Sequence, residues 1–135
     1  MTNPMIYRLI YLSSGTEAVT AAIIDQIVAE AQVKNAKQRV TGLLAYNGRN
    51  FMQVLEGESS IISELFQRIE TDPRHRDVTI LIEEYDVARA FDDWAMQALS
   101  LASGVLSRRA QMESIFPARL SARARAIMLS IATFG

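Results

Sequence analysis

An Asn-Gly turn between two strand-like runs, with a helix-like segment on either side, constrains the fold more than any other feature of this chain. The runs are Val40–Tyr46 and Phe51–Leu55, and the sequence Asn47-Gly48-Arg49-Asn50 joins them. Asn-Gly in this setting is typical of a β-hairpin, because both residues tolerate positive φ. The middle of the chain is therefore predicted to be an antiparallel pair of strands.

The flanking helices each carry one apolar stripe at four-residue spacing, formed by Ile23, Ile27 and Ala31 in the first and by Ile61, Leu65 and Ile69 in the second. This spacing places the apolar side chains on one face of an α-helix. The first helix is predicted from about Thr20, a plausible N-cap, to Lys34. The second begins at Ser59 or Ser60 and ends at Asp72-Pro73.

Three further strands complete the pattern, at Ile6–Leu12, Val78–Glu84 and Asp93–Leu101. The order is β-α-β-β-α-β with one additional strand. It predicts an α+β fold, a ferredoxin-like sandwich in which both helices pack on one face of a mixed five-stranded sheet.

The last thirty or so residues read as helical again. Val105–Phe116 and Ala118–Phe134 are the two pieces, and Pro117 interrupts them. Two helices cannot cover both faces of five strands, so this tail is expected to cover the exposed face or to help a second copy do so. The expected organisation is one domain at 1–103 and a C-terminal helical extension for packing, oligomerisation or output at 104–135.

Composition narrows the function classes. The 135 residues fit one domain, and half of them are hydrophobic. A net charge of −1 gives no reason to expect a nucleic-acid partner, and no apolar run approaches the roughly 18–20 residues of a membrane span. The N-terminus lacks the pattern of a secretory signal, so the cytoplasm is the expected compartment. The absence of cysteine excludes thiolate catalysis and zinc–thiolate sites.

Two polar side chains fall on apolar strand faces. Gln53 shares a face with Phe51 and Leu55, and Tyr11 shares one with Tyr7 and Leu9. A buried amide without partners costs roughly 1–3 kcal/mol, so Gln53 needs a partner. Backbone or water contacts could satisfy Gln53, and Tyr11 could be an ordinary core aromatic; a ligand is the alternative for both.

Other candidates also have a structural and a functional interpretation. Asn35, placed after the first helix, is either a C-terminal cap or a ligand-binding amide. The basic group after the second helix is either solvated or binds a phosphate; it comprises Arg68, Arg74 and His75. Trp94 and Met96 share one face of the last strand, where core packing is the simple explanation. No nucleotide-loop or metalloprotease motif is present, and a single histidine excludes a His-rich metal site.

Between Ile6 and Leu99 the sequence resembles the BLUF family, blue-light sensors that use FAD. The matching pieces, in chain order, are Tyr7-Arg-Leu-Ile-Tyr11-Leu-Ser-Ser14, Asn35 ahead of Val40-Thr-Gly-Leu-Leu44, Phe51-Met-Gln53-Val-Leu-Glu-Gly57, Arg68-Ile69 with Asp72-Pro-Arg-His75, and Asp93-Trp-Ala-Met96. The resemblance implies a non-covalently bound flavin, FAD with FMN or riboflavin as alternatives, lying between the two helices.

The resemblance also implies roles for individual residues. Ile27 and Ile69 would contact the two faces of the flavin ring, and Asn35 would bind its polar edge. Lys34, just before Asn35 at a position that varies in the family, and Asp72, in the fourth matching piece, would also bind the cofactor. The ribityl-phosphate end would lie near Arg68, Arg74 and His75. Tyr11 and Gln53 would be the photoactive pair, and Trp94 with Met96 would report the change.

The residue types suit such a switch. An excited flavin is a strong one-electron oxidant, and the phenol of Tyr11 can give up an electron and a proton together. Gln53 offers a donor and an acceptor on one neutral side chain, so its rearrangement alters hydrogen bonds without placing a charge in the core. The expected output is a population shift that passes through the last strand and the C-terminal helices to a separate signalling protein, with a homo-oligomer as the expected assembly.

Two other functions remain open on sequence grounds. A flavin-dependent redox enzyme would need a substrate face and a reductant site, although no nicotinamide motif is present. A cofactor-free ferredoxin-like regulatory module is the second alternative. RNA binding is disfavoured, because the exposed aromatic and basic residues that it requires are absent. The sequence favours a photosensory protein over an enzyme.

Overall fold

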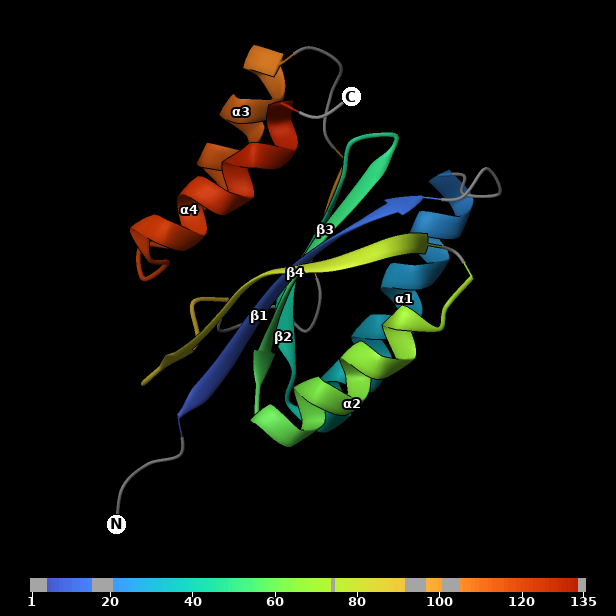
Figure 1. The fold of residues 1–135 in the computed structure, drawn as a ribbon, viewed down its shortest axis with the longest axis vertical. Coiled ribbons are helices and arrows are strands. Elements are labelled where there is room, and N and C mark those ends of the chain that lie inside the picture. Colours follow the sequence, from blue (N-terminus) through green and yellow to red (C-terminus); the bar gives the residue numbers. More distant parts are fainter. Residues whose placement is uncertain (1–4, 16–20, 74, 92–96, 101–104, 134–135) are drawn as a thin grey trace.

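The computed structural model describes every residue except 1–4, 16–20, 74, 92–96, 101–104 and 134–135. The described strands are β1 (Ile6–Gly15), β2 (Thr41–Tyr46), β3 (Asn50–Gly57), β4 (His75–Asp86) and β5 (Gln97–Ser100). The helices are α1 (Ala21–Gln38), α2 (Ser59–Glu70), α3 (Val105–Ser114) and α4 (Ala122–Leu129), followed by a short 3-10 helix, η1 (Ser130–Thr133). The sheet separates α1 and α2 from α3 and α4 (Figure 1).

The five strands form one sheet in the order β4-β1-β3-β2-β5. All neighbours are antiparallel except β2 and β5, which run parallel. The first four strands have the arrangement predicted from the β-α-β-β-α-β pattern, and β5 adds to the edge beside β2. The predicted ferredoxin-like α+β fold with a fifth strand is therefore confirmed, and β3 occupies the centre of the sheet between β1 and β2.

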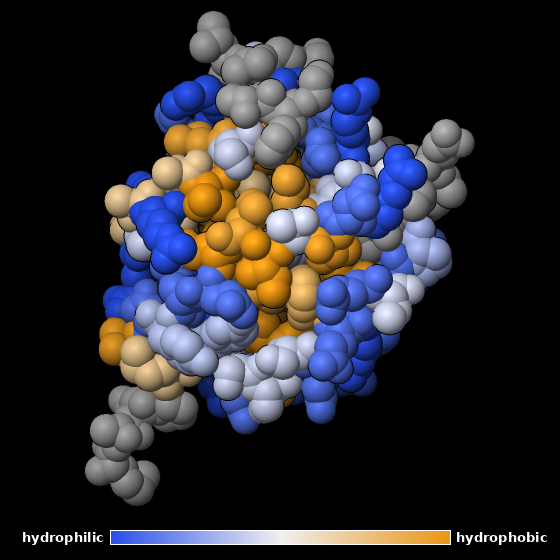
Figure 2. All heavy atoms as spheres, in the orientation of Figure 1, coloured by the Kyte–Doolittle hydropathy of each residue, from blue (hydrophilic) through white to orange (hydrophobic). Residues whose placement is uncertain are grey.

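Side chains of the central strands alternate between two cores. On one face the sheet packs against α1 and α2; buried there are Tyr7, Leu9, Tyr11, Leu44, Phe51 and Leu55. On the other face it packs against the C-terminal helices; buried there are Ile10, Leu43, Met52, Val54, Met112, Ala124, Met128 and Ile131. The C-terminal helices thus cover the second face, as predicted. Between the two helical layers apolar atoms reach the surface, along the edge formed by β4, where Ile80 is exposed (Figure 2).

The predicted hairpin is present, and its turn depends on one glycine. Gly48 has a φ of 94°, a conformation that costs glycine little. The Asn47 side chain accepts hydrogen bonds from the backbone N–H groups of Arg49 and Asn50, at 3.0 and 2.7 Å. Asn47 therefore closes the turn through its side chain, while Gly48 supplies the positive φ.

Helix α1 is longer than predicted, which changes the position of Asn35. The helix continues to Gln38, and Arg39 takes the left-handed conformation with a φ of 57°. The N–H of Val40 donates to the carbonyl of Asn35 at 2.9 Å, and that of Arg39 donates to Ala36. This is the bonding pattern of a Schellman cap. The prediction that the helix ends near Lys34 with Asn35 after it is wrong, because nothing in residues 36–38 disfavours another helical turn. Of the two interpretations of Asn35, the structure excludes the C-terminal cap.

Boundaries of other predicted elements also differ from the structure or lie outside the described residues. Strand β4 extends beyond Val78–Glu84 at both ends. The last helix begins after Ser121 rather than at Ala118, because the Ser121 hydroxyl accepts the N–H of Ala124 and caps α4 there. The start of the predicted fifth strand lies outside the described residues, as does Thr20; from Gln97 onward the strand is present.

Candidate functional site

A pocket lies between α1 and α2 against the sheet. Its lining comes from both helices, from three strands and from the turn after α2: Tyr11, Ile27, Glu30, Ala31, Lys34, Asn35, Gln38, Leu44, Phe51, Gln53, Leu65, Arg68, Ile69 and Asp72. The residues from α1 recur every three or four positions, so they share one face of that helix. Segments far apart in the sequence therefore meet at this site.

Tyr11 and Gln53 form a buried hydrogen-bonded pair in the wall of this pocket. They are directly opposite each other in the β1–β3 register. The Tyr11 hydroxyl donates to Oε1 of Gln53, and the two side chains are 0% and 7% exposed. Burial, and then the negative charge of Asp72, raise the pKa of Tyr11 well above its usual value. The phenol therefore keeps its proton at neutral pH and holds it toward the amide.

Packing fixes the orientation of this pair. The ring of Phe66 on α2 meets the Tyr11 ring edge-on, with centroids 5.6 Å apart and planes at 62°. Leu44 of β2 lies opposite Gln53 in the β2–β3 register and is also buried. Edge-to-face aromatic contacts and close neighbours restrict rotation of both side chains. The polar pair is therefore held in a defined geometry within an otherwise apolar wall.

The two helices supply apolar walls that face each other across the pocket. Ile27 and Ala31 come from α1, while Leu65 and Ile69 come from α2. Asn35 also lines the pocket and is only 2% exposed, which makes it the second buried amide at this site after Gln53. A buried amide offers both a donor and an acceptor. A ligand with flat apolar faces and a polar edge matches this set of groups.

Charged residues lie at the solvent side of the same pocket. Lys34 and Arg68 are exposed, as is Glu30, while Asp72 is partly buried. Two cations beside an apolar cavity can hold an anionic group of a ligand whose body is buried. The pocket is therefore apolar and amide-lined inside and charged at its mouth.

The structure brings together eight of the twelve residues singled out in the sequence. These line the pocket: Tyr11, Ile27, Lys34, Asn35, Gln53, Arg68, Ile69 and Asp72. Arg74, Trp94 and Met96 lie outside the described residues. Of His75 only the backbone is described, opening β4 opposite Gly15.

Sequence reasoning missed three lining residues: Glu30, Gln38 and Leu44. Helical spacing from Ile27 and Asn35 contains the signal for Glu30 and Gln38, but Gln38 required the longer helix. Leu44 could be found only from the register of β2 against β3. Ala31, Phe51 and Leu65 were recognised as apolar core positions but not as part of a site.

No helix in the described part of the chain is long and apolar enough to cross a membrane. Within the same residues, no group of three or more His, Cys, Asp or Glu side chains is arranged to hold a metal ion.

The curated proteins that this chain resembles include ones named as light-regulated or photoactivated. The Escherichia coli protein "Blue light- and temperature-regulated antirepressor BluF" is 33% identical over 97 residues, covering 72% of this chain and 24% of its own length. Photoactivated adenylate cyclase subunit beta of Euglena gracilis is 33% identical over 92 residues, covering 67% of this chain and 11% of its own length. The chain therefore spans about a quarter or less of these curated relatives.

Solved structures agree over nearly the whole chain. The BLUF domain of BlrP1 superposes with a TM-score of 0.83 at 29% identity, covering 97% of this chain and 92% of that one. The dark-state structure of BlrB, a BLUF protein, gives 0.73 at 32% identity, covering 96% and 97%. A structure of Klebsiella pneumoniae BlrP1 with FMN and cyclic diGMP gives 0.80 at 32% identity, covering 95% of this chain and 35% of that one.

A family model described as "Sensors of blue-light using FAD" matches residues 6–97. That segment holds β1 to β4, the first residue of β5 and the whole α1–α2 pocket. The chain belongs to the BLUF family of flavin-binding blue-light sensors.

Proposed function

We propose that this chain is a blue-light photoreceptor domain that holds its flavin in the α1–α2 pocket and switches through Tyr11 and Gln53. The observation that carries the proposal is the buried hydrogen bond from Tyr11 to Gln53 in the pocket wall. The pocket also fits a flavin by its chemistry, since apolar walls suit the flat ring and buried amides suit its polar edge. The cations at the mouth suit a phosphate.

Each pocket residue has a specific task in this proposal. Ile27 and Ile69 contact the ring from opposite helices, and the Asn35 amide binds the polar edge. Lys34 and Arg68 stabilise the negative charge of the phosphate end, where Asp72 limits how much positive charge accumulates. The position of each residue on the pocket lining and its side-chain chemistry support these tasks.

The switch itself resides in two side chains. A bound flavin absorbs blue light and, when excited, becomes a strong one-electron oxidant. Tyr11 would give an electron to the excited flavin and its hydroxyl proton to Oε1 of Gln53, which accepts the hydrogen bond from that hydroxyl. The Gln53 amide then rotates or tautomerises and presents a different atom to Tyr11. When electron and proton return to Tyr11, the new amide arrangement persists until it relaxes in the dark.

The output is a change in how this domain binds a signalling partner. Relatives named as an antirepressor and as photoactivated adenylate cyclase subunits show that the domain type occurs with different effectors. For this chain we propose a partner protein that binds through the last strand or the C-terminal helices. Trp94 and Met96, just ahead of β5, are the proposed reporters of the change in Gln53.

One spectroscopic experiment tests the photosensor. Protein reconstituted with FAD is illuminated with blue light, and its absorption is followed during and after illumination. The wild type is expected to show a red-shifted flavin spectrum that reverts in darkness, with no substrate added. Gln53→Leu keeps the volume but removes both hydrogen-bonding groups, so it should bind flavin and lose the shift. A full shift in Gln53→Leu would refute the switch.

A second measurement separates the sensor from a flavin redox enzyme. NADH is added anaerobically in the dark, and the flavin absorbance is recorded. A sensor has no site that delivers hydride to the ring, so bleaching should be slow. Rapid dark bleaching would favour the enzyme, and protein that stays colourless with FAD would favour a cofactor-free module.

A further inference from the structure

A row of polar side chains crosses the sheet on the face opposite the pocket. Thr41, Glu56, Arg8 and Glu84 come from β2, β3, β1 and β4, and each is the direct register partner of the next. Glu56 is three residues from Gln53 on β3, so the two side chains lie on opposite faces of the same strand. This row is called the transverse row below.

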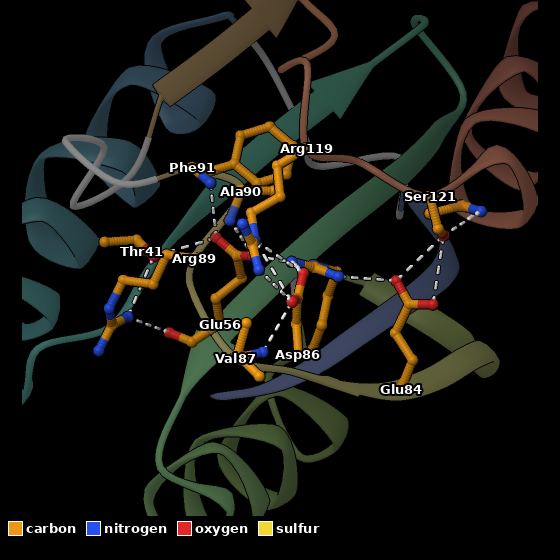
Figure 3. Close-up of polar contacts among 12 residues, drawn as sticks. Thr41, Glu56, Glu84, Asp86, Val87, Arg89, Ala90, Phe91, Arg119 and Ser121 are labelled. Atoms are coloured by element: carbon orange, nitrogen blue, oxygen red, sulfur yellow. Dashed lines mark hydrogen bonds and ion pairs between the residues drawn. The ribbon is translucent and has the colours of Figure 1, made fainter. Parts of the chain in front are cut away.

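Glu56 is the most heavily bonded member of the transverse row. Its side chain is 0% exposed and accepts from Nε of Arg8 at 2.8 Å and from the Thr41 hydroxyl at 3.2 Å. The same carboxylate accepts the backbone N–H groups of Ala90 and Phe91, at 2.8 and 2.7 Å. Arg89 donates to the Glu56 carbonyl and to Thr41 (Figure 3). Residues 89–91, which lead toward β5, are thus fastened to β3.

The other end of the transverse row reaches the C-terminal helices. Arg8 donates to Glu84 at 2.8 Å and to Asp86 at 3.2 Å. The Ser121 hydroxyl donates to the carboxylate of Glu84, while it accepts the N–H of Ala124 as the N-cap of α4 (Figure 3). Arg119 binds Asp86 at 2.9 Å. The N-terminus of α4 is therefore tied to the sheet through Glu84.

The buried charges of the transverse row are not explained by stability alone. Buried ion pairs contribute little net stability, because desolvation offsets their attraction, and apolar residues of similar volume are often at least as stable. The hydrogen bonds of the transverse row instead fix the positions of residues 89–91 and of the start of α4 relative to β3. A change in β3 or its neighbours can then reach both segments.

We propose that the transverse row transmits the state of the pocket to α4 and to residues 89–91, with Glu56 and Ser121 as positioning residues; the proposal rests on the photosensor function above. Gln53 changes its partners on one face of β3, and the row on the other face moves with the strand. The segment that responds is the chain's own C-terminal helix pair. Its packing against the sheet differs between the dark and the illuminated protein.

The test uses two variants and a matched control. Ser121→Asp keeps the N-cap, since Asp caps helices well, but it cannot donate to Glu84 and faces a like charge. Glu56→Gln keeps one acceptor oxygen and removes the charge that Arg8 binds. Ser107→Asp adds the same charge to the exposed first turn of α3. Amide hydrogen exchange of residues 105–133 is measured in FAD-loaded protein, in darkness and under blue light.

In the wild type and in Ser107→Asp, exchange near the start of α4 is expected to differ between light and dark. In Ser121→Asp and Glu56→Gln this difference is expected to be lost, while the flavin spectrum still shifts. A role confined to stability would raise exchange equally in both conditions. Retention of the wild-type difference in Ser121→Asp, which needs no buried substitution, would overturn the proposal, as would the absence of any difference in the wild type. Loss of the photosensor itself is recognised separately, by a wild-type spectrum that does not shift.

Discussion

Replacing Arg8 with methionine should destabilise the protein severely, because it leaves a buried carboxylate without its cation. Arg8 is 1% exposed and Glu56 is 0% exposed, and their 2.8 Å contact is one of three that Arg8 makes to carboxylates of the described residues. Methionine fills most of the same space, so the loss is chiefly electrostatic. The substitution therefore measures the cost of stranding Glu56.

The magnitude follows from what Glu56 retains. Removing one partner of a buried ion pair typically costs about 3–5 kcal/mol. Glu56 keeps the Thr41 hydroxyl and the N–H groups of Ala90 and Phe91, which places the expected loss near the lower end, at about 3 kcal/mol. Glu84 and Asp86 lose less, because Ser121 and Arg119 still bind them. A domain of this size has about 5–15 kcal/mol in total, so the loss is a large share.

Urea unfolding of the FAD-loaded protein, followed by far-ultraviolet circular dichroism, measures this loss. At a slope of about 2 kcal/mol per molar urea, the midpoint should fall by about 1.5 M. Arg109→Met is the matched control, since Arg109 contacts Glu113 at 3.7 Å on the surface with both side chains about half exposed. That pair should contribute less than about 0.5 kcal/mol. Equal midpoints for the two variants would refute the reasoning.

Four further substitutions give three separate predictions. Gly42→Ala should fold poorly, since a Cβ there would lie 1.8 Å from the carbonyl oxygen of Val54, whereas Gly48→Ala meets no atom and should cost only about 1–2 kcal/mol for its φ of 94°; thermal melts compare the two. The hydrogen bond from Arg119, together with that from Arg8, lowers the pKa of Asp86 from 3.8 to about 2 despite partial burial. A depressed pKa contributes stability that is present above about pH 4 and is lost as the pH falls toward 2, so Asp86→Asn should flatten that part of the acid-unfolding curve by about 1 kcal/mol after solvent screening; a variant with the wild-type acid profile would contradict this. Arg68→Gln should weaken FAD and FMN binding but leave riboflavin binding unchanged, because only the first two carry phosphate. Calorimetric titration with the three flavins measures this. Weaker riboflavin binding in the variant would mean that Arg68 contacts the ring and would contradict the prediction.

The local elements could be read from the sequence because their signals are local. The stripes of α1 and α2, the Asn47-Gly48 turn and the alternation in β1 each lie within a few residues of chain. The order of these elements then restricts the topology, and the sheet order β4-β1-β3-β2-β5 follows that restriction. The end of α1 was missed because a helix stops where its cap forms, and the left-handed conformation of Arg39 has no clear signature in the sequence.

The polar residues show the limit of this reading. Strand alternation alone placed the polar side chains of Gln53 and Tyr11 on apolar faces, and the family resemblance assigned them a role. Their direct opposition across β1 and β3 depends on strand register, which the sequence of either strand does not contain. The transverse row was not foreseen at all, because Thr41, Glu56, Arg8 and Glu84 are separated by 15 to 76 positions in the chain.

The sequence by itself determined which segments form strands and helices, the family, and which residues are unusual for their positions. Only the tertiary structure decided which of those residues meet, how deeply they are buried and which ones line a common pocket. The physical reason is that hydrophobic periodicity acts over a few neighbouring residues, whereas a hydrogen bond between distant segments exists only once sheet register and helix packing have fixed their separation.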